Sequence, residues 1–291
     1  MKERIGVLLF LILVLGGLQA GINRRDFQSI QSPCASSGCE AKIYPTPSTT
    51  PKLTLTPTVK PTPSPSPVYH GYCLYVPVLY YHHIQPQAEA VANKQTSVSI
   101  DTVFFENQMA YINSHGYTVI SALDLVNALR NHTALPPKSI VVTIDDGYSD
   151  LYTYAFPIIK RYNIHVSLMI PSGLVGNSGF ITWDQLREMQ SSGLIYFVDH
   201  SWSHYAATNN LSKIKYEVET ARSQIENNLG QKVDLFAYPY GAYNNLEIQV
   251  LKEDGFLGAY STLGGGYQCD SYIYTLHRIR IGNAPLSAYG L

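Results

Sequence analysis

Apolar positions between residues 71 and 291 alternate between two periods, which predict strands and helices in turn. Short, β-branched apolar runs of the kind that form buried strands occupy 76–81, 118–120, 139–145, 166–170, 195–199, 235–238 and 257–260, and Ile279 with Ile281 mark a last one. Between the first two runs, Phe105, Met109 and Ile112 recur at helical spacing, and Gly116 is the expected stop. The repeated alternation predicts an α/β domain.

Further helices are expected at 122–130, 151–158, 183–192 and 244–254. The most regular one places Ile214, Val218, Ala221 and Ile225 on one face, with Ser212 as its N-cap and Gly230 as its stop.

No Gly-rich dinucleotide motif follows any of these strands, which favours a barrel over a doubly wound sheet. We therefore expect a single α/β barrel over residues 71–291.

The N-terminal part has a different composition. Lys2 and Arg4 precede an apolar run that ends near Ala20, which is short for a membrane span of ~20 residues. Residues 1–21 are interpreted as a signal peptide or an uncleaved membrane anchor. Residues 22–70 include a Pro-, Thr- and Ser-rich tract at 44–68 and are expected to form a disordered linker. Both alternatives predict an exported protein, secreted or held at the cell surface.

Export places the four cysteines in an oxidising compartment. Three pairings are open, and the preferred one joins Cys34 to Cys39 and Cys73 to Cys269. Free thiols remain the alternative.

The composition of the chain restricts the classes of partner that the protein is expected to bind. The net charge is −1 and charged residues make up 14% of the chain, which argues against nucleic-acid binding. The 23 tyrosines, against 9 phenylalanines, suit contact with polar ligands such as sugars, and equally suit an exported protein's surface.

The motif VVTIDDGY, residues 141–148, contains the first candidates for catalytic or ligand-binding residues. Asp145 and Asp146 lie where a buried strand ends, and Gly147 permits a sharp turn. Ligands of parallel α/β folds bind at this end of the strands. Adjacent side chains point in different directions, so the two aspartates can serve different roles. The structural alternative is an acidic turn in which Asp146 caps the next helix.

A second motif, DHSWSH at residues 199–204, follows another strand. His200 and His204 are four residues apart, a spacing typical of metal ligands, and Ser201 is placed to orient one of them. One aspartate with two histidines would form a three-ligand site with an open position, as in catalytic metal centres. In a third motif, FAYPYG at 236–241, Pro239 and Gly241 bend the chain and can leave backbone N–H groups facing a cleft.

These motifs resemble those of the polysaccharide deacetylases with a NodB-homology domain (carbohydrate esterase family 4), in the form of the extracellular poly-N-acetylglucosamine deacetylases. PVLYYHHI, ITWDQLREM and LHRIRI add to the resemblance, which covers roughly residues 75–285. It implies a single distorted (β/α) barrel of the NodB type, TIM-like with about seven strands, over residues 71–291. It also implies a metal-dependent N-deacetylase that acts on a polysaccharide containing N-acetylglucosamine, in exopolysaccharide or peptidoglycan. We expect the protein to be a monomer.

The resemblance also implies residue roles. Asp146, His200 and His204 would bind a divalent metal, most simply Zn²⁺, with Co²⁺ or Ni²⁺ as alternatives. Asp145 would be the general base for a water molecule, the backbone N–H of Tyr240 an oxyanion donor and His277 the general acid. His82, Tyr238 and Pro239 are the expected substrate-binding residues.

Two positions depart from the family pattern. Leu276 and His277 are adjacent, whereas relatives have one residue between them. Ala237 stands where relatives often have an arginine that holds the catalytic aspartate, so Arg278 or Arg280 is expected to reach Asp145 instead. An O-acetyl (xylan) esterase and a non-catalytic glycan-binding protein are the alternative functions.

Overall fold

The structure, a computed structural model, describes residues 70–291 and is built around a curled, fully parallel sheet of eight strands. Its strand order is β10–β9–β8–β7–β6–β2–β12, with β5 beside β6. The strands are β2 (Val78–Tyr81), β5 (Thr118–Ile120), β6 (Ser139–Asp145), β7 (Val166–Ile170), β8 (Ile195–Asp199), β9 (Leu235–Ala237), β10 (Gly258–Tyr260) and β12 (Ile279–Arg280). The predicted α/β barrel architecture is confirmed.

The two ends of this sheet approach each other. Tyr260 of β10 forms an isolated parallel bridge with Leu276, three residues before β12. Because β12 pairs with β2, the chain nearly closes the curled sheet into a barrel.

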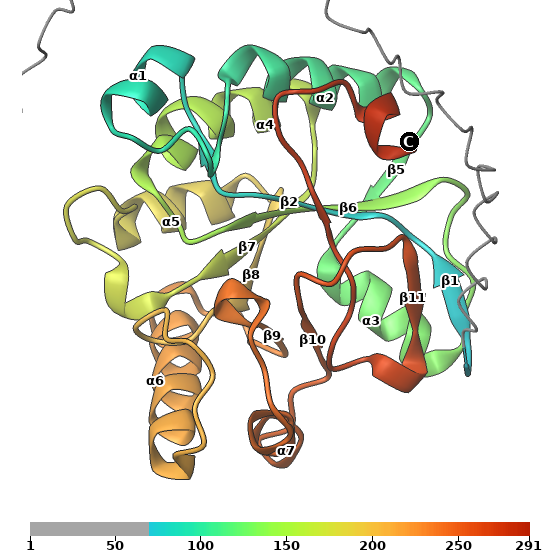
Figure 1. The fold of residues 1–291 in the computed structure, drawn as a ribbon, viewed down its shortest axis with the longest axis vertical. Coiled ribbons are helices and arrows are strands. Elements are labelled where there is room, and N and C mark those ends of the chain that lie inside the picture. Colours follow the sequence, from blue (N-terminus) through green and yellow to red (C-terminus); the bar gives the residue numbers. More distant parts are fainter. Residues whose placement is uncertain (1–69) are drawn as a thin grey trace, which may run out of the picture. The chain divides into compact units, whose positions relative to one another are not determined.

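Helices surround the strands (Figure 1): α1, α2 and α4 lie above the sheet in this view, and α6 and α7 lie below it. All seven residues of β6 are buried, as expected for a parallel strand covered on both faces. The helices are α1 (Gln87–Ala92), α2 (Thr102–Ser114), α3 (Ala122–Asn131), α4 (Phe156–Tyr162), α5 (Trp183–Ser191), α6 (Leu211–Leu229) and α7 (Asn245–Glu253).

Several local details differ from the sequence expectation. The N-cap of α6 is Asn210, whose side chain accepts a hydrogen bond from the N–H of Lys213, so the assignment of Ser212 was wrong. The expected helix at 151–158 begins with a π-helical turn, Leu151–Ala155, before α4. Two small pairings, β3 (His83–Ile84) with β4 (Ser99–Ile100) and β1 (Cys73–Tyr75) with β11 (Tyr267–Cys269), were not predicted, because such short segments carry little periodicity.

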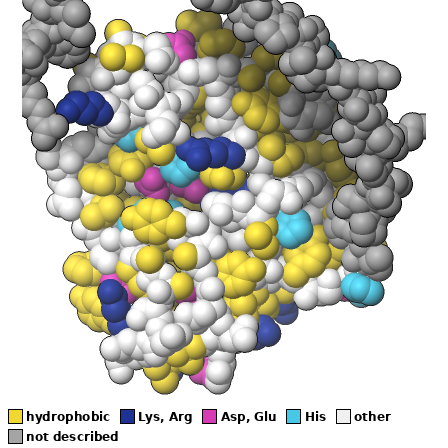
Figure 2. All heavy atoms as spheres, viewed as in Figure 1, with side chains coloured by type: hydrophobic (Ala, Val, Ile, Leu, Met, Phe, Trp, Pro, Cys, Tyr) yellow, Lys and Arg dark blue, Asp and Glu magenta, His cyan; other side chains and the backbone are white. Residues whose placement is uncertain are grey.

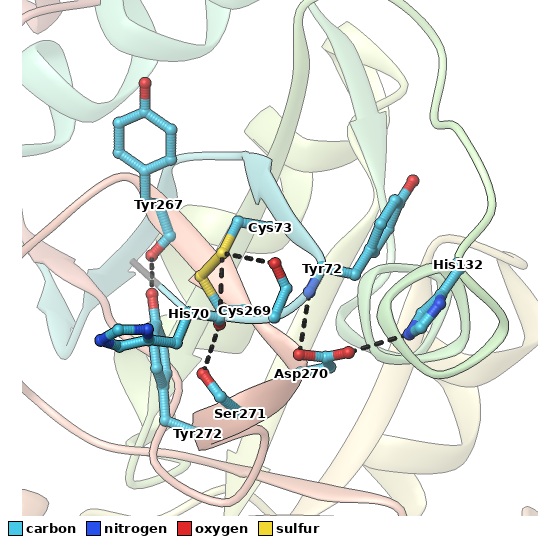
Figure 3. The surroundings of a disulfide bond; sticks show 10 residues. His70, Tyr72, Cys73, His132, Tyr267, Cys269, Asp270, Ser271 and Tyr272 are labelled. Carbon is cyan, nitrogen blue, oxygen red and sulfur yellow. Dashed lines mark hydrogen bonds and ion pairs between the residues drawn. A yellow bond between two sulfur atoms is a disulfide. The ribbon is translucent and has the colours of Figure 1, made fainter. Parts of the chain in front are cut away.

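A disulfide joins Cys73 to Cys269 across the antiparallel β1–β11 pair, as expected (Figure 3). Beside it, Asp270 accepts a hydrogen bond from the N–H of Tyr72 and contacts His132 at the end of α3. The predicted Cys34–Cys39 bond and the N-terminal targeting segment lie outside the described residues.

No helix within residues 70–291 has the length and apolar character needed to cross a bilayer.

Candidate active site

The candidate site lies at the carboxyl edge of the parallel sheet. Asp146 follows β6, His200 follows β8, the Pro239–Gly241 turn follows β9, and His82 follows β2. Because all these strands run in the same direction, their carboxyl ends meet at one edge.

Asp146, His200 and His204 come together in a compact cluster. Oδ1 of Asp146 lies 3.4 Å from Nε2 of His200 and 3.0 Å from Nε2 of His204. One ligand atom from each residue can be chosen so that all lie within 4.8 Å of one another. Asp146 and His200 are buried and His204 is half-buried, so the cluster is reachable from solvent at the His204 side.

Two backbone features orient the histidines. Nδ1 of His200 lies 2.7 Å from the carbonyl oxygen of Ala237 at the end of β9, so Nδ1–H is the donor and Nε2 keeps its lone pair toward Asp146. Ser201 and His204 have φ angles of 62° and 56°, in the left-handed region, which brings both imidazoles to the same side of a tight loop.

Three buried carboxylates, Asp199, Glu217 and Glu247, accept hydrogen bonds from the loop that carries the two histidines. Asp199 accepts a hydrogen bond from the N–H of Ser201, and Glu217 accepts bonds from both the N–H and Oγ of Ser203. Glu247 of α7 accepts a bond of 2.5 Å from the hydroxyl of Tyr205. Burial raises the pKa of Glu247 to about 7, although the Tyr205 bond acts in the opposite direction.

The cluster fits a divalent metal ion. Oδ1 of Asp146 is buried and has no hydrogen-bond donor within the described part of the chain. It faces Nε2 of both His200 and His204, and a cation shared by these atoms would stabilise the buried carboxylate. Burial raises the pKa of Asp146, but His200 and His204 together hold it well below its usual range.

Asp145 points to the other side of the turn and pairs with Arg278. Its Oδ1 lies 2.7 Å from a terminal guanidinium nitrogen, and both side chains are almost fully buried. The same nitrogen contacts Oγ1 of Thr143, while Nε of Arg278 donates to the carbonyl oxygen of Ser261. Arg278 therefore supplies the positive charge that Ala237 lacks.

Two further side chains of the β2 end lie near this pair. The guanidinium of Arg278 lies 4.6 Å from the ring centroid of Tyr80, and the ring of His82 lies 5.6 Å from that of Tyr80. Burial lowers the pKa of His82, whereas the nearby charges of Asp145 and Asp146 raise it. His82 is thus within electrostatic reach of both aspartates.

The structure does not bring His277 to the cluster. Its ring stacks on Tyr272 with centroids 4.7 Å apart, its backbone N–H and carbonyl bond the side chain of Gln268, and its Nδ1 borders Gly265. Arg278 points toward Asp145, so the preceding side chain faces away in this extended segment.

In the third motif, FAYPYG, Tyr238 and Pro239 are buried, whereas Tyr240 is exposed. Tyr238 is fully buried and donates its hydroxyl to the carbonyl oxygen of Tyr274, so the burial argues against the contact between Tyr238 and substrate, which stays a prediction. Pro239 is also buried, and this turn side chain has little surface for a ligand. Tyr240 is 69% exposed, has a φ of 60°, and places its ring 4.6 Å from that of His204. Its N–H lies in the first turn of a 3₁₀ helix, where N–H groups lack helical acceptors.

Sequence reasoning missed Tyr148 and Tyr80. The ring of Tyr148 stacks 3.6 Å from that of His83, and burial together with the adjacent Asp146 raises its pKa. Tyr148 belongs to the motif VVTIDDGY and Tyr80 to PVLYYHHI, but no sequence pattern distinguishes a tyrosine of an active site from one that packs in the core. Figure 2 shows the result on the surface: acidic and histidine side chains gather at the centre of this face, beside a Lys or Arg side chain and within a ring of hydrophobic ones.

Comparisons with known proteins agree with this geometry. Residues 132–259 match the family model described as polysaccharide deacetylase. The protein YxkH of Bacillus subtilis is 26% identical over 208 residues, 71% of each chain. The poly-beta-1,6-N-acetyl-D-glucosamine N-deacetylase of Escherichia coli is 27% identical over 249 residues, which cover 70% of this chain and 36% of that enzyme. The solved structure of the Streptococcus pyogenes deacetylase PplD in complex with acetate has a TM-score of 0.66 and 26% identity, over 72% of this chain and 92% of that one.

Proposed function

We propose that the chain is a member of the polysaccharide deacetylase family and that it is an exported, metal-dependent enzyme that removes N-acetyl groups from a polysaccharide containing N-acetylglucosamine. Water would be added across the amide C–N bond, which yields acetate and a free amino group on the sugar. The observation that carries the proposal is the Asp146–His200–His204 cluster beside a separate, arginine-paired Asp145.

Asp146, His200 and His204 would hold the metal, for which nitrogen and carboxylate ligands favour Zn²⁺, with Co²⁺ or Ni²⁺ as alternatives. When bound, such an ion acts as a Lewis acid that polarises a carbonyl oxygen and makes water more acidic.

Asp145 would accept the proton from the attacking water, because Arg278 fixes the position of this carboxylate through a hydrogen bond of 2.7 Å. The N–H of Tyr240 would stabilise the developing oxyanion from the opposite wall.

We assign the general-acid role to His82 in place of His277. His82 lies close enough to Asp145 and Asp146 for both to act on its pKa, whereas the contacts of His277 are with Gly265, Gln268 and Tyr272. A proton from His82 would convert the sugar nitrogen into a leaving amine.

The non-catalytic glycan-binding alternative arose from the displaced His277 and from the arginine missing at Ala237. Arg278 provides the same charge from the last part of the barrel, so that argument no longer favours loss of catalysis. The disulfide between Cys73 and Cys269 supports export, to the extracellular space or to a surface anchor at residues 1–21. We propose that the protein acts as a monomer.

Acetate release from peptidoglycan, chitooligosaccharides, poly-N-acetylglucosamine and an O-acetylated xylan, with and without chelator, tests the proposal. We expect release from at least one N-acetylated polymer, lost with chelator and restored by Zn²⁺ or Co²⁺. Release from the xylan alone would favour the esterase, and no release from any polymer with metal supplied would contradict the proposal.

Single variants separate the roles. Asp145→Asn should keep bound metal, measured by elemental analysis, but lose about 10²-fold or more in kcat. His200→Ala should lose both metal and turnover, because it removes a ligand. Equal metal loss in the two variants would contradict the division between base and ligand.

A further inference from the structure

A second polar pocket adjoins the candidate site and shares His82 with it. Besides His82, its wall is formed by the 96–99 segment before α2 and by the chain around β12. The lining residues are His82, Thr96, Ser97, Val98, Ser99, Arg280, Ile281, Gly282, Asn283 and Tyr289. A group bound there would therefore sit next to the reacting acetamide.

The charge of this pocket comes from Arg280. The side chain is exposed, and a terminal guanidinium nitrogen donates to the carbonyl oxygen of Ser97, which fixes the group at the pocket wall. Within residues 70–291, Arg280 forms no ion pair with a carboxylate, and the wall itself contains no Asp or Glu. The remaining polar groups are hydroxyls, an amide and backbone, which can accept or donate hydrogen bonds without charge.

A neighbouring pocket shows the opposite character. It is lined by His83 in place of His82 and contains the carboxylates of Glu89 and Asp150. Asp150 pairs with His83 and accepts the N–H of Ile84. The charged side chains that line these two pockets at the end of β2 therefore differ in sign. Of the two, only the pocket at His82 presents a cation that no carboxylate neutralises.

We propose that the pocket at Arg280 binds an anionic substituent of the glycan, a carboxylate or a phosphate, while the adjacent N-acetyl group is hydrolysed. The inference rests on the proposed deacetylase function and specifies its substrate class. A guanidinium can donate two parallel hydrogen bonds to two oxygens of either group, and its bond to Ser97 fixes its position in advance. Arg280 would thus determine specificity without taking part in bond breaking.

The test compares three N-acetylglucosamine oligomers of equal length: one neutral, one with a carboxylate on a lactyl ether and one with a sugar phosphate. We expect the wild-type chain to have a higher kcat/KM for at least one anionic oligomer. Arg280→Gln should lower that preference about tenfold, mainly through KM, and Arg280→Lys should retain most of it. The control Lys160→Gln, which removes a charge from α4, should leave the preference unchanged. Added salt should weaken the preference.

A wild-type enzyme that hydrolyses the neutral oligomer at least as well as both anionic ones would overturn the proposal, as would an equal loss on all three in Arg280→Gln. Equilibrium binding of the three oligomers to Asp145→Asn, with and without Arg280→Gln, tests the pocket without turnover. If no oligomer releases acetate but anion-selective binding depends on Arg280, the pocket stands and the enzymatic proposal fails. If the neutral oligomer binds as tightly as the anionic ones, the proposed anion-binding role of the pocket is refuted.

Discussion

Residues of the candidate site adopt backbone conformations that most side chains avoid. Asp146, Ser201, His204 and Tyr240 have φ angles between 56° and 72°, and none is glycine. Such conformations persist only where surrounding contacts impose them, and here they turn the Asp146 and His204 side chains toward one another. The sequence shows which residues carry chemistry, but nothing in it shows this backbone geometry.

The Asp145–Arg278 pair gives the first prediction at this scale. Arg278→Gln should lower the free energy of unfolding by about 3–5 kcal/mol, because it leaves a buried carboxylate without its cation. It should also lower kcat about 10²-fold while bound metal is retained, and Arg278→Lys should recover part of kcat. Urea unfolding, elemental analysis and acetate release measure the three effects.

The matched control is Arg161→Gln, which breaks a partly exposed pair with Glu106. It should change stability by at most about 1 kcal/mol and leave kcat unaffected. Equal effects of the two variants would show that the burial of Arg278 is not what matters.

His82 and His277 are the two candidates for the general acid, and substitutions can distinguish them. His82→Gln should reduce kcat by about 10²-fold or more with metal retained, because His82 is near both aspartates. His277→Gln should reduce kcat only a few-fold, because Gln268 bonds the backbone of His277 and not its ring. The reverse order in acetate release would return the acid role to His277.

At the scale of elements, sequence patterns located most of the barrel because its strands and helices bury long apolar faces. The seven-residue run of β6 and the stripe of α6 are examples, both almost fully buried on the predicted positions. Short strand pairs such as β3–β4 were not predicted, since they depend on neighbours distant in the chain. In the same way, Asp146, His200 and His204 were found by local spacing. By contrast, the choice of Arg278 over Arg280 and the burial of Tyr238 required the fold.

The contact between α7 and the histidine loop predicts a pH dependence of stability. The pKa of Glu247 is raised from 4.5 to about 7, so the folded state binds more protons than the unfolded state between these values. Stability contributed by this group is therefore present at low pH and is lost as pH rises from 4.5 through 7, by at most about 3 kcal/mol. Glu247→Gln should remove that part of the difference in unfolding free energy between pH 5 and pH 8.

A surface pair of the same chemistry provides the control. Glu188 accepts a hydrogen bond of 2.5 Å from Tyr152, but this bond is exposed to solvent. Glu188→Gln should leave the pH dependence of urea unfolding as it is in the wild type. If both variants flatten the curve alike, burial of Glu247 is not its origin.

Over the whole molecule, the disulfide links the start of the described domain to the segment that positions Arg278. Cys269 belongs to β11, and its neighbour Gln268 bonds the backbone N–H and carbonyl of His277. Arg278 follows directly and reaches Asp145. The pattern LHRIRI therefore includes a histidine whose backbone is fixed by Gln268 and an arginine that extends into the site.

This connection predicts separable effects of removing the disulfide. The double variant Cys73→Ala/Cys269→Ala should lose about 2–5 kcal/mol of stability, because the bond closes a loop with a sequence separation of 196 residues. For a domain of this size, its thermal midpoint should fall by several degrees. Well below that midpoint, kcat should fall several-fold while metal affinity stays the same, since the ligands follow β6 and β8 and not β11. Cys34→Ala/Cys39→Ala is the control and should leave the midpoint of the barrel in place. An unchanged midpoint in the first variant, or metal affinity that falls with kcat, would contradict this coupling.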